Sequence, residues 1–279
     1  ADLAIALDPD ADRCALGIRG PDGWRMLRGD ETGTLLAEHI LPAPHFPEVA
    51  DAAGPAAGGP LVATTIVSST LLGRIAAARG ARHRTTLTGF KWLVRAGDGL
   101  VYAYEEALGI CVDPDAVRDK DGISAAVALC RMVAGLRARE RTVADELNRL
   151  AAEFGVHAGT QVSVRVQTLE TIRTLMEQLR SDPPRLLART SVTSEDLLRR
   201  DDHLHTDALV FEGGLPDADR DGAGLRLVIR PSGTEPKIKA YLEVTMPPAD
   251  DVESARARAA ALLDDAASDV RRMLASASG

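Results

Sequence analysis

The sequence predicts an α/β protein that ends in a smaller α+β domain. In the first half of the chain, apolar runs typical of buried strands alternate with segments of helical periodicity, which indicates a largely parallel sheet covered by helices. In the last part, strands of alternating polarity are followed by a long helix. We therefore expect the remnant of one α/β domain, then one complete α/β domain with a mixed sheet, then the smaller α+β domain.

The first expected element is the apolar run Leu3–Leu7, which predicts a buried strand of a parallel or mixed sheet. A protein rarely begins inside its own core, and residue 1 is not Met, so we expect upstream sequence to be missing. A second strand is predicted over 14–18, a turn over 20–23 and a helix over 32–40. The first domain is therefore expected to be only a remnant.

The middle of the chain alternates strands with helices. Strands are predicted over 61–67 and 100–104, and helices over 71–79 and 123–139. The loop 42–60, rich in Pro, Ala and Gly, is assigned no function. The inward face of the second helix is expected to carry Ile123, Val127, Cys130 and Ala134, with Val133 as a further candidate.

The last part differs in pattern. A half-exposed strand is predicted over 161–166 and a helix over 169–179. Two further strands, over 225–229 and 238–244, are expected to pair across a short loop, before a terminal helix over 251–274. This arrangement is typical of an α+β domain.

Composition excludes several classes of protein. The net charge of −8 argues against non-specific nucleic-acid binding, although local cations can still bind an anionic small molecule. No run of about 18 apolar residues is present to cross a membrane, so a cytoplasmic location is expected. The three cysteines and six histidines form no spacing typical of a disulfide framework, a zinc site or a catalytic triad.

An acidic segment follows the first predicted strand directly. Asp8, Asp10 and Asp12 alternate, so their carboxylates can project to one side of an extended segment and bind Mg²⁺, which prefers oxygen ligands. A calcium-binding EF-hand loop is excluded, because it would need Gly at Arg13 and Glu at Arg19. An exposed acidic turn without a metal remains the alternative.

The segment 230–236, RPSGTEP, lies between the two strands expected to pair. Arg230 offers a guanidinium for bidentate phosphate contact, while Ser232 and Thr234 offer hydroxyls and Gly233 permits close backbone approach to an anion. An ordinary hairpin turn is the alternative. A hairpin, however, does not require Arg at one end and two lysines at the other.

Two further segments carry charged residues next to predicted elements. Lys120 lies just before the helix expected over 123–139, where it could transfer a proton to and from a sugar hydroxyl. A solvated lysine beside the helix-capping Asp121 is the alternative. Glu105 follows a predicted strand in the sequence YEEALG, where a carboxylate suits sugar hydroxyls but equally suits a solvated loop.

Taken in order along the chain, these four segments resemble the α-D-phosphohexomutase family, which includes phosphoglucomutases and phosphomannomutases. The resemblance runs from Asp8 to about Val244 and is most specific at RPSGTEP. It implies three domains in this chain: the remnant of a metal-binding domain over 1–28, a sugar-binding α/β domain over 29–155 and a phosphate-binding α+β domain over 156–279.

The resemblance also implies roles for individual residues. Arg13 would face a phosphoserine, and Lys120 would be the general acid/base. The other implied residues are Mg²⁺ ligands Asp8, Asp10 and Asp12, substrate contacts Glu105, Thr88, Gly89 and Lys91, and phosphate contacts Arg230, Ser232, Gly233 and Thr234.

Two departures from the family pattern bear on function. Ala107 stands where many members have Ser in the sugar loop, and YEEALG resembles the phosphopentomutase-like branch, so hexose and pentose 1-phosphates both remain candidate substrates. No TASHNP-like phosphoserine loop is present. The family's N-terminal domains are therefore expected to be partners, and this chain alone is expected to bind phosphosugar and sugar bisphosphate without turnover.

Two other functions remain open from the sequence. An apolar strand ending in Asp-x-Asp also opens haloacid-dehalogenase-like phosphatases, in which Asp8 would be the nucleophile, with Ser68 and Lys91 as partners. Pro9 and the RPSGTEP segment count against that class. The third possibility is a non-catalytic phosphosugar-binding module.

Overall fold

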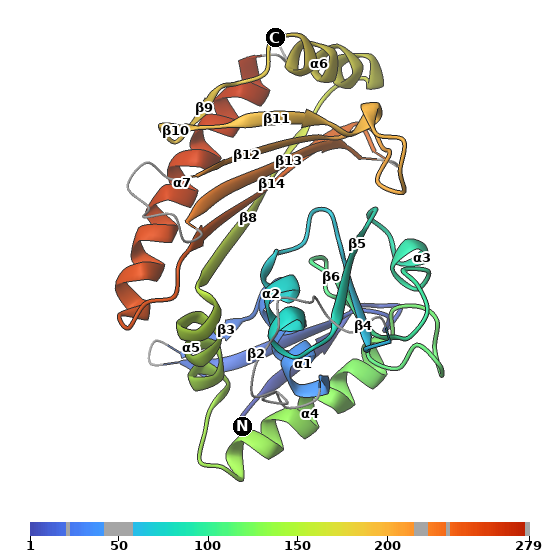
Figure 1. Ribbon diagram of the computed structural model, residues 1–279, viewed down its shortest axis with the longest axis vertical. Helices are drawn as coiled ribbons and strands as arrows, with labels where there is room; N and C mark the ends of the chain where they lie inside the picture. Colours follow the sequence, from blue (N-terminus) through green and yellow to red (C-terminus); the bar gives the residue numbers. More distant parts are fainter. Residues whose placement is uncertain (21–22, 42–57, 215–222, 233–234, 277–279) are drawn as a thin grey trace. The chain divides into compact units, whose positions relative to one another are not determined.

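Figure 1 shows the computed structural model of the chain, which describes residues 1–20, 23–41, 58–214, 223–232 and 235–276. Most of the loop predicted over 42–60 and part of the turn predicted over 20–23 lie outside these residues. The chain divides into two units, Ala1–Leu150 and Ala151–Gly279.

The first unit begins with a three-stranded antiparallel sheet of β1 (Ala4–Leu7), β2 (Cys14–Gly20) and β3 (Gly23–Met26). The prediction that the first apolar run is a buried strand of a parallel or mixed sheet is wrong. Among the described strands, β1 pairs with β2 alone, and it is mostly exposed, with Leu7 43% accessible. In the middle strand, by contrast, Cys14, Leu16 and Ile18 are buried.

A second, mixed sheet follows in the order β5-β4-β6-β7. β4 pairs in parallel with β5 and β6, and β7 returns antiparallel to β6, as expected for an α/β domain with a mixed sheet. The elements are α1 (Gly29–Ile40), β4 (Leu61–Thr65), α2 (Leu71–Ala78), β5 (Arg82–Thr86), α3 (Phe90–Leu93), β6 (Leu100–Glu105), β7 (Gly109–Cys111), α4 (Gly122–Arg137) and α5 (Val143–Phe154).

The predicted inward face of α4 is largely wrong. Ile123 and Val127 are 60% and 57% exposed, and Cys130 and Ala134 are also exposed, whereas Val133 is buried as suggested. The helix has a second apolar stripe at helical spacing, and this second stripe is the one that packs against the rest of the unit. Its members are Ala125, Leu129, Met132, Val133 and Leu136.

Helix α1 approaches the mixed sheet closely because two of its residues lack side chains. A Cβ on Gly29 would lie 2.0 Å from the Glu106 carbonyl oxygen, and one on Gly33 would lie 2.5 Å from the buried Tyr104 ring. The Tyr102 hydroxyl also donates to the Gly33 carbonyl at 2.7 Å. This contact fixes the end of β6 and the loop that follows it.

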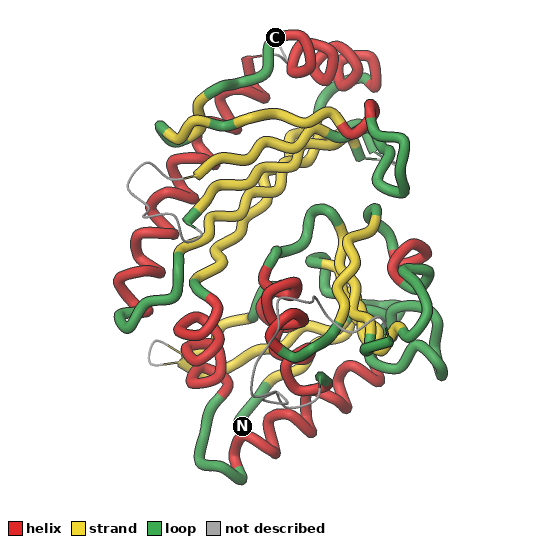
Figure 2. The backbone as a smooth tube through the Cα atoms, in the orientation of Figure 1, coloured by secondary structure: helices red, strands yellow, loops and turns green. Residues whose placement is uncertain are grey.

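The second unit is built on an antiparallel sheet in the order β11-β12-β13-β14-β8. The predicted pairing of 225–229 with 238–244 is confirmed, with Leu225 opposite Val244. Figure 2 shows helix α7 running along this sheet. The elements are β8 (Val156–Arg165), α6 (Leu169–Ser181), β9 (Leu186–Leu187), β10 (Thr190–Ser191), β11 (Thr193–Asp196), a 3₁₀ turn (Leu197–Arg199), β12 (Leu209–Gly214), β13 (Gly224–Pro231), β14 (Lys237–Met246) and α7 (Val252–Ser276).

The core of the second unit joins the sheet to α6 and α7. Phe211, Leu227, Ile238 and Val270 are wholly buried in it. This arrangement of an antiparallel sheet with helices is the α+β architecture expected from the sequence. Among the described helices, none combines the length and the apolar character needed to cross a membrane.

Two glycines within helices of the first unit should respond oppositely to Ala. We expect Gly33→Ala to lower the free energy of unfolding by about 1–3 kcal/mol, because its Cβ would overlap the Tyr104 ring. We expect Gly135→Ala to raise it by about 0.5–1 kcal/mol, because the nearest atom to its Cβ is 3.9 Å away and Ala favours the helix. Urea unfolding followed by tryptophan fluorescence measures both, since Trp24 and Trp92 lie in this unit. Equal effects of the two substitutions would contradict the close contact.

Candidate active site

The segment from Asp8 to Arg13 connects β1 to β2 as a fixed turn. The Asp8 carboxylate accepts hydrogen bonds from the backbone N–H groups of Asp12 and Arg13, both at 3.1 Å. Ala11 has a φ of +55°, a left-handed conformation uncommon for a residue with a side chain, and its N–H donates to the Asp8 carbonyl at 2.9 Å. These hydrogen bonds therefore fix the backbone that carries the acidic residues of the turn.

The first residue of α4 packs directly on this turn. The Gly122 N–H donates to the Ala11 carbonyl at 3.1 Å. A Cβ on Gly122 would lie 2.7 Å from that oxygen and 2.6 Å from the Arg13 carbonyl oxygen, so only glycine permits this approach. Asp121 caps the helix by accepting from the Ile123 N–H at 3.0 Å. The start of α4 and the acidic turn are thus one local structure.

This contact brings Lys120 to Asp12. The Lys120 ammonium lies 2.7 Å from the Asp12 carboxylate, and the two side chains are 20% and 30% exposed. Hydrogen bonding to Asp12 raises the pKa of Lys120, and the same hydrogen bond lowers the pKa of Asp12. In this arrangement Lys120 is a protonated donor.

Glu105 lies at the end of β6 beside these charges. Burial raises the pKa of its carboxyl, and the positive charges of Arg13 and Lys120 oppose that rise. The backbones of Arg13 and Gly109 pair in an isolated antiparallel β-bridge, and the Cys14 N–H donates to the Leu108 carbonyl at 3.2 Å. The structure therefore brings together four residues singled out in the sequence, namely Asp12, Arg13, Glu105 and Lys120.

Next to Glu105 lies a polar network that sequence reasoning missed. Glu106 accepts from the Ser68 and Thr65 hydroxyls at 3.3 and 3.4 Å. Asp30 accepts from the Tyr104 hydroxyl at 3.0 Å and from the Ser69 N–H at 2.8 Å. The available signal was the row of hydroxyl residues that follows β4, because the ends of parallel strands are common positions for functional groups.

Residues 88–91 form a turn at the start of helix α3, near the loop that follows Glu105. Gly89 has a φ of +109°, and a Cβ on Gly109 would meet both Phe90, at 3.0 Å, and Glu105, at 2.8 Å. The residue after Phe90, Lys91, is exposed, with its ammonium 5.2 Å from the centre of the Trp92 ring. Thr88 is half-buried. The turn is therefore close to Glu105 through Phe90.

The acidic turn offers carboxylate oxygens, which are the donors that a hard divalent cation prefers. Asp8, Asp10 and Asp12 supply carboxylate oxygens, and Asp8 is already oriented by two N–H groups. Within the described residues, however, no group of three His, Cys, Asp or Glu side chains is arranged to hold a metal. Because Asp12 pairs with Lys120, cation binding by all three carboxylates would require Asp12 to exchange partners.

In the second unit, Arg230 and Ser232 lie at the end of β13. Arg230 is opposite Lys239 of β14, and the Ser232 N–H donates to the Lys237 carbonyl at 2.8 Å. The Lys237 ammonium donates to Glu235 at 3.0 Å and lowers the pKa of that carboxyl. Gly233 and Thr234, predicted to contact phosphate, lie outside the described residues.

Comparisons with known proteins agree on one family. Residues 28–154 match the family model "Phosphoglucomutase/phosphomannomutase, alpha/beta/alpha domain III", and residues 188–262 match "Phosphoglucomutase/phosphomannomutase, C-terminal domain". A probable phosphomannomutase of Haemophilus influenzae is 39% identical over 87% of this chain and 46% of its own length. Human phosphopentomutase is 31% identical over 89% of this chain and 43% of its own length.

The fold of this chain is also similar to that of a solved structure. The crystal structure of parafusin, a phosphoglucomutase from Paramecium, matches with a TM-score of 0.64 at 19% identity, over 98% of this chain and 46% of that one. At this identity the likeness concerns the fold alone. The chain spans less than half the length of these relatives.

The raised pKa of Glu105 should make the stability of the first unit depend on pH. The folded carboxyl keeps its proton to a higher pH than the unfolded one, whose pKa is about 4.5. The free energy of unfolding should therefore fall as pH rises from 4.5 through the folded pKa. Glu105→Gln should remove this fall, as measured by urea unfolding at a series of pH values.

Glu140→Gln is the matched control, because it makes the same charge change at an exposed position of the same unit. Its stability should follow the unsubstituted chain across the pH series. If the free energy of unfolding changed with pH in the same way for Glu105→Gln and for the unsubstituted chain, Glu105 would not be held in a buried site.

Proposed function

This chain belongs to the α-D-phosphohexomutase family of phosphoglucomutases and phosphomannomutases, and we propose that it supplies the metal, sugar and phosphate contacts of a phosphosugar mutase. The reaction would move a phosphoryl group between the C1 hydroxyl and the C6 or C5 hydroxyl of a sugar through a bisphosphate. The observation that carries the proposal is the cluster of Asp12, Arg13, Glu105 and Lys120 at the start of α4.

Lys120 is suited to hold and transfer a proton at the reacting hydroxyl. Its ammonium is a donor, and Asp12 at 2.7 Å is an acceptor that fixes its position. Arg13 carries an exposed guanidinium on the same turn, where it can neutralise the transferring phosphoryl group. Glu105, half-buried beside them, is suited to accept hydrogen bonds from sugar hydroxyls.

Asp8, Asp10 and Asp12 would hold Mg²⁺, with Asp12 exchanging its contact with Lys120 for the cation. When bound, the cation would neutralise charge on the transferring phosphoryl oxygens. Asp8 already uses one carboxylate oxygen to hold the turn, so its other oxygen is the one suited to a cation. Thr88, Gly89 and Lys91 would add substrate contacts, since their turn packs on the Glu105 loop through Phe90.

The second unit would bind the phosphate that does not react. Arg230 and Ser232 follow the last residue of β13 that pairs with β12, and their backbone is held by β14 alone among the described strands, through Lys239 and Lys237. Gly233 and Thr234 would complete the contact. An arginine suits this role because its planar guanidinium binds phosphate in a bidentate manner.

We further propose that this chain alone binds hexose or pentose 1-phosphates without turning them over. Two observations support this: no TASHNP-like phosphoserine loop is present in the 279 residues, and the chain matches only 46% and 43% of two relatives. The whole reaction would need the N-terminal domains that those relatives contain. Relatives named phosphomannomutase and phosphopentomutase support both sugar classes.

Phosphorus NMR of glucose 1-phosphate with this chain and Mg²⁺ tests the proposal. We expect the substrate resonance to broaden without new products, because the chain has binding groups but no phosphoserine. Arg230→Gln should weaken this binding at least tenfold. Arg226→Gln should leave it unchanged, because Arg226 lies on the same strand but pairs with Glu212 at 3.0 Å.

The other outcomes separate the competing functions. Accumulation of glucose 6-phosphate would show a complete mutase, and accumulation of inorganic phosphate would support a phosphatase. No broadening of either glucose 1-phosphate or ribose 1-phosphate would contradict phosphosugar binding. Turnover restored by adding the N-terminal half of a relative would distinguish an incomplete enzyme from a binding module.

A further inference from the structure

The first unit has a polar cavity that shares no lining residue with the candidate active site. Its volume is about 330 Å³, a size that admits a small metabolite. Its lining combines four arginines with two glutamates, one histidine and a few apolar side chains. The charged members are Arg79, Arg139, Arg141, Arg149, Glu38 and Glu146.

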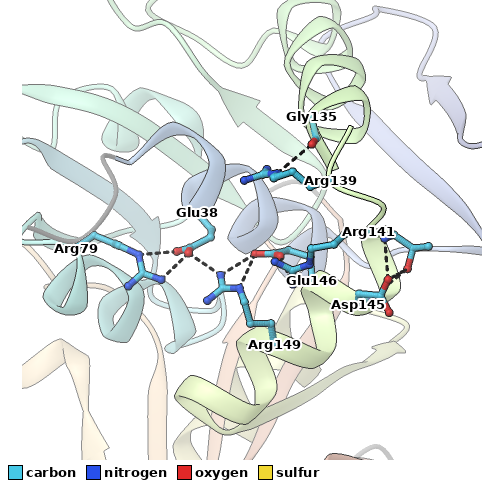
Figure 3. Close-up of polar contacts among 9 residues, drawn as sticks. Glu38, Arg79, Gly135, Arg139, Arg141, Asp145, Glu146 and Arg149 are labelled. Atoms are coloured by element: carbon cyan, nitrogen blue, oxygen red, sulfur yellow. Dashed lines mark hydrogen bonds and ion pairs between the residues drawn. The ribbon is translucent and has the colours of Figure 1, made fainter. Parts of the chain in front are cut away.

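The two carboxylates are shared among the arginines. Glu38 receives the Arg79 guanidinium at 2.5 Å and that of Arg149 at 2.6 Å. Figure 3 shows these three side chains converging from the end of α2, from α5 and from α1. Both Arg79 and Glu38 are largely buried, with side chains 6% and 13% exposed. Attraction between them is therefore screened less than at the surface.

Glu146 is shared in the same way. It accepts from Arg149 at 2.7 Å and pairs with Arg141 at 2.8 Å. With four guanidinium groups and two carboxylates, the lining keeps an excess of two positive charges. His39 does not add to this excess, because burial, followed by the charges of Arg131 and Arg139, lowers its pKa and favours the neutral imidazole.

Arg139 has no carboxylate partner among the described residues. Its Nε donates to the Gly135 carbonyl at 3.1 Å (Figure 3), which leaves its terminal nitrogens available as donors. The backbone between Arg139 and Arg141 is held in an uncommon shape, since Glu140 has a φ of +55°. The Arg141 N–H donates back to the Leu136 carbonyl at 2.9 Å, which ends α4 with both arginines at the cavity.

We propose that this cavity is a binding site for a small dianionic phosphate compound, separate from the candidate active site. A phosphate dianion matches the excess of two positive charges, and planar guanidinium groups bind its oxygens in pairs. The cavity is larger than a bare phosphate needs, so a small phosphorylated metabolite fits it as well. The site does not depend on the function proposed above.

Isothermal titration calorimetry with inorganic phosphate tests this site in the Arg230→Gln chain, where the proposed substrate-phosphate contact is removed. We expect millimolar or tighter binding, which Arg139→Gln weakens at least tenfold. Arg139 is the sharpest choice because, within the part of the chain that the structure describes, it makes no ion pair whose loss would disturb the fold. Arg137→Gln is the matched control: Arg137 lies on α4, pairs with Asp2 and does not line the cavity.

A second readout locates the bound anion. Phosphate should shift the imidazole NMR signals of His39, which lines the cavity, but leave those of His83 unchanged, since His83 bonds Thr64 elsewhere in the unit. Titration of glucose 1-phosphate alongside phosphate distinguishes a metabolite site from a site for free phosphate. No phosphate binding, equal binding by Arg139→Gln and Arg137→Gln, or shifts at His83 alone would overturn the proposal.

Discussion

The candidate active site depends on one close contact between backbones. The first residue of α4, Gly122, lies so near the acidic turn that a Cβ would come within 2.7 Å of two carbonyl oxygens. This contact places Lys120 beside Asp12, although 107 residues separate them between positions 13 and 119. Gly29 and Gly33 of α1 make similar close contacts with Glu106 and Tyr104, the two neighbours of Glu105 in the sequence. Close backbone contacts at these glycines thus determine where the charged side chains lie.

The fold class was predictable because its strongest signals are local. The strand predicted over 61–67, which became β4, and the two strands predicted over 225–229 and 238–244, which became β13 and β14, needed no knowledge of the rest of the chain. The strand β5, with the sequence RHRTT, has no such signal and owes its existence to pairing with β4. For α4, two apolar stripes compete at helical spacing, and periodicity alone cannot say which stripe faces the core.

Part of the candidate site was predictable as a group of residues, whereas its contacts were not. The order of the motifs along the chain grouped Asp12, Arg13, Glu105 and Lys120, and the structure brings these four together. Their roles remain predictions. The sequence could not indicate that Asp12 takes Lys120 as its partner, because such a pair depends on how two distant loops pack. Nor did it indicate the bonds from Ser68 and Thr65 to Glu106.

The strand order of the second unit has a consequence for how that unit acquires its structure. Among the described strands of this unit, the first, β8, pairs only with the last, β14, so that Val156 lies opposite Met246. Closing so long a loop costs conformational entropy before the pairing can repay it, which slows folding. During synthesis, β8 leaves the ribosome before β14, and both of its edges stay unpaired until β14 follows. A chaperone that shields this strand during elongation would therefore protect the nascent chain from aggregation.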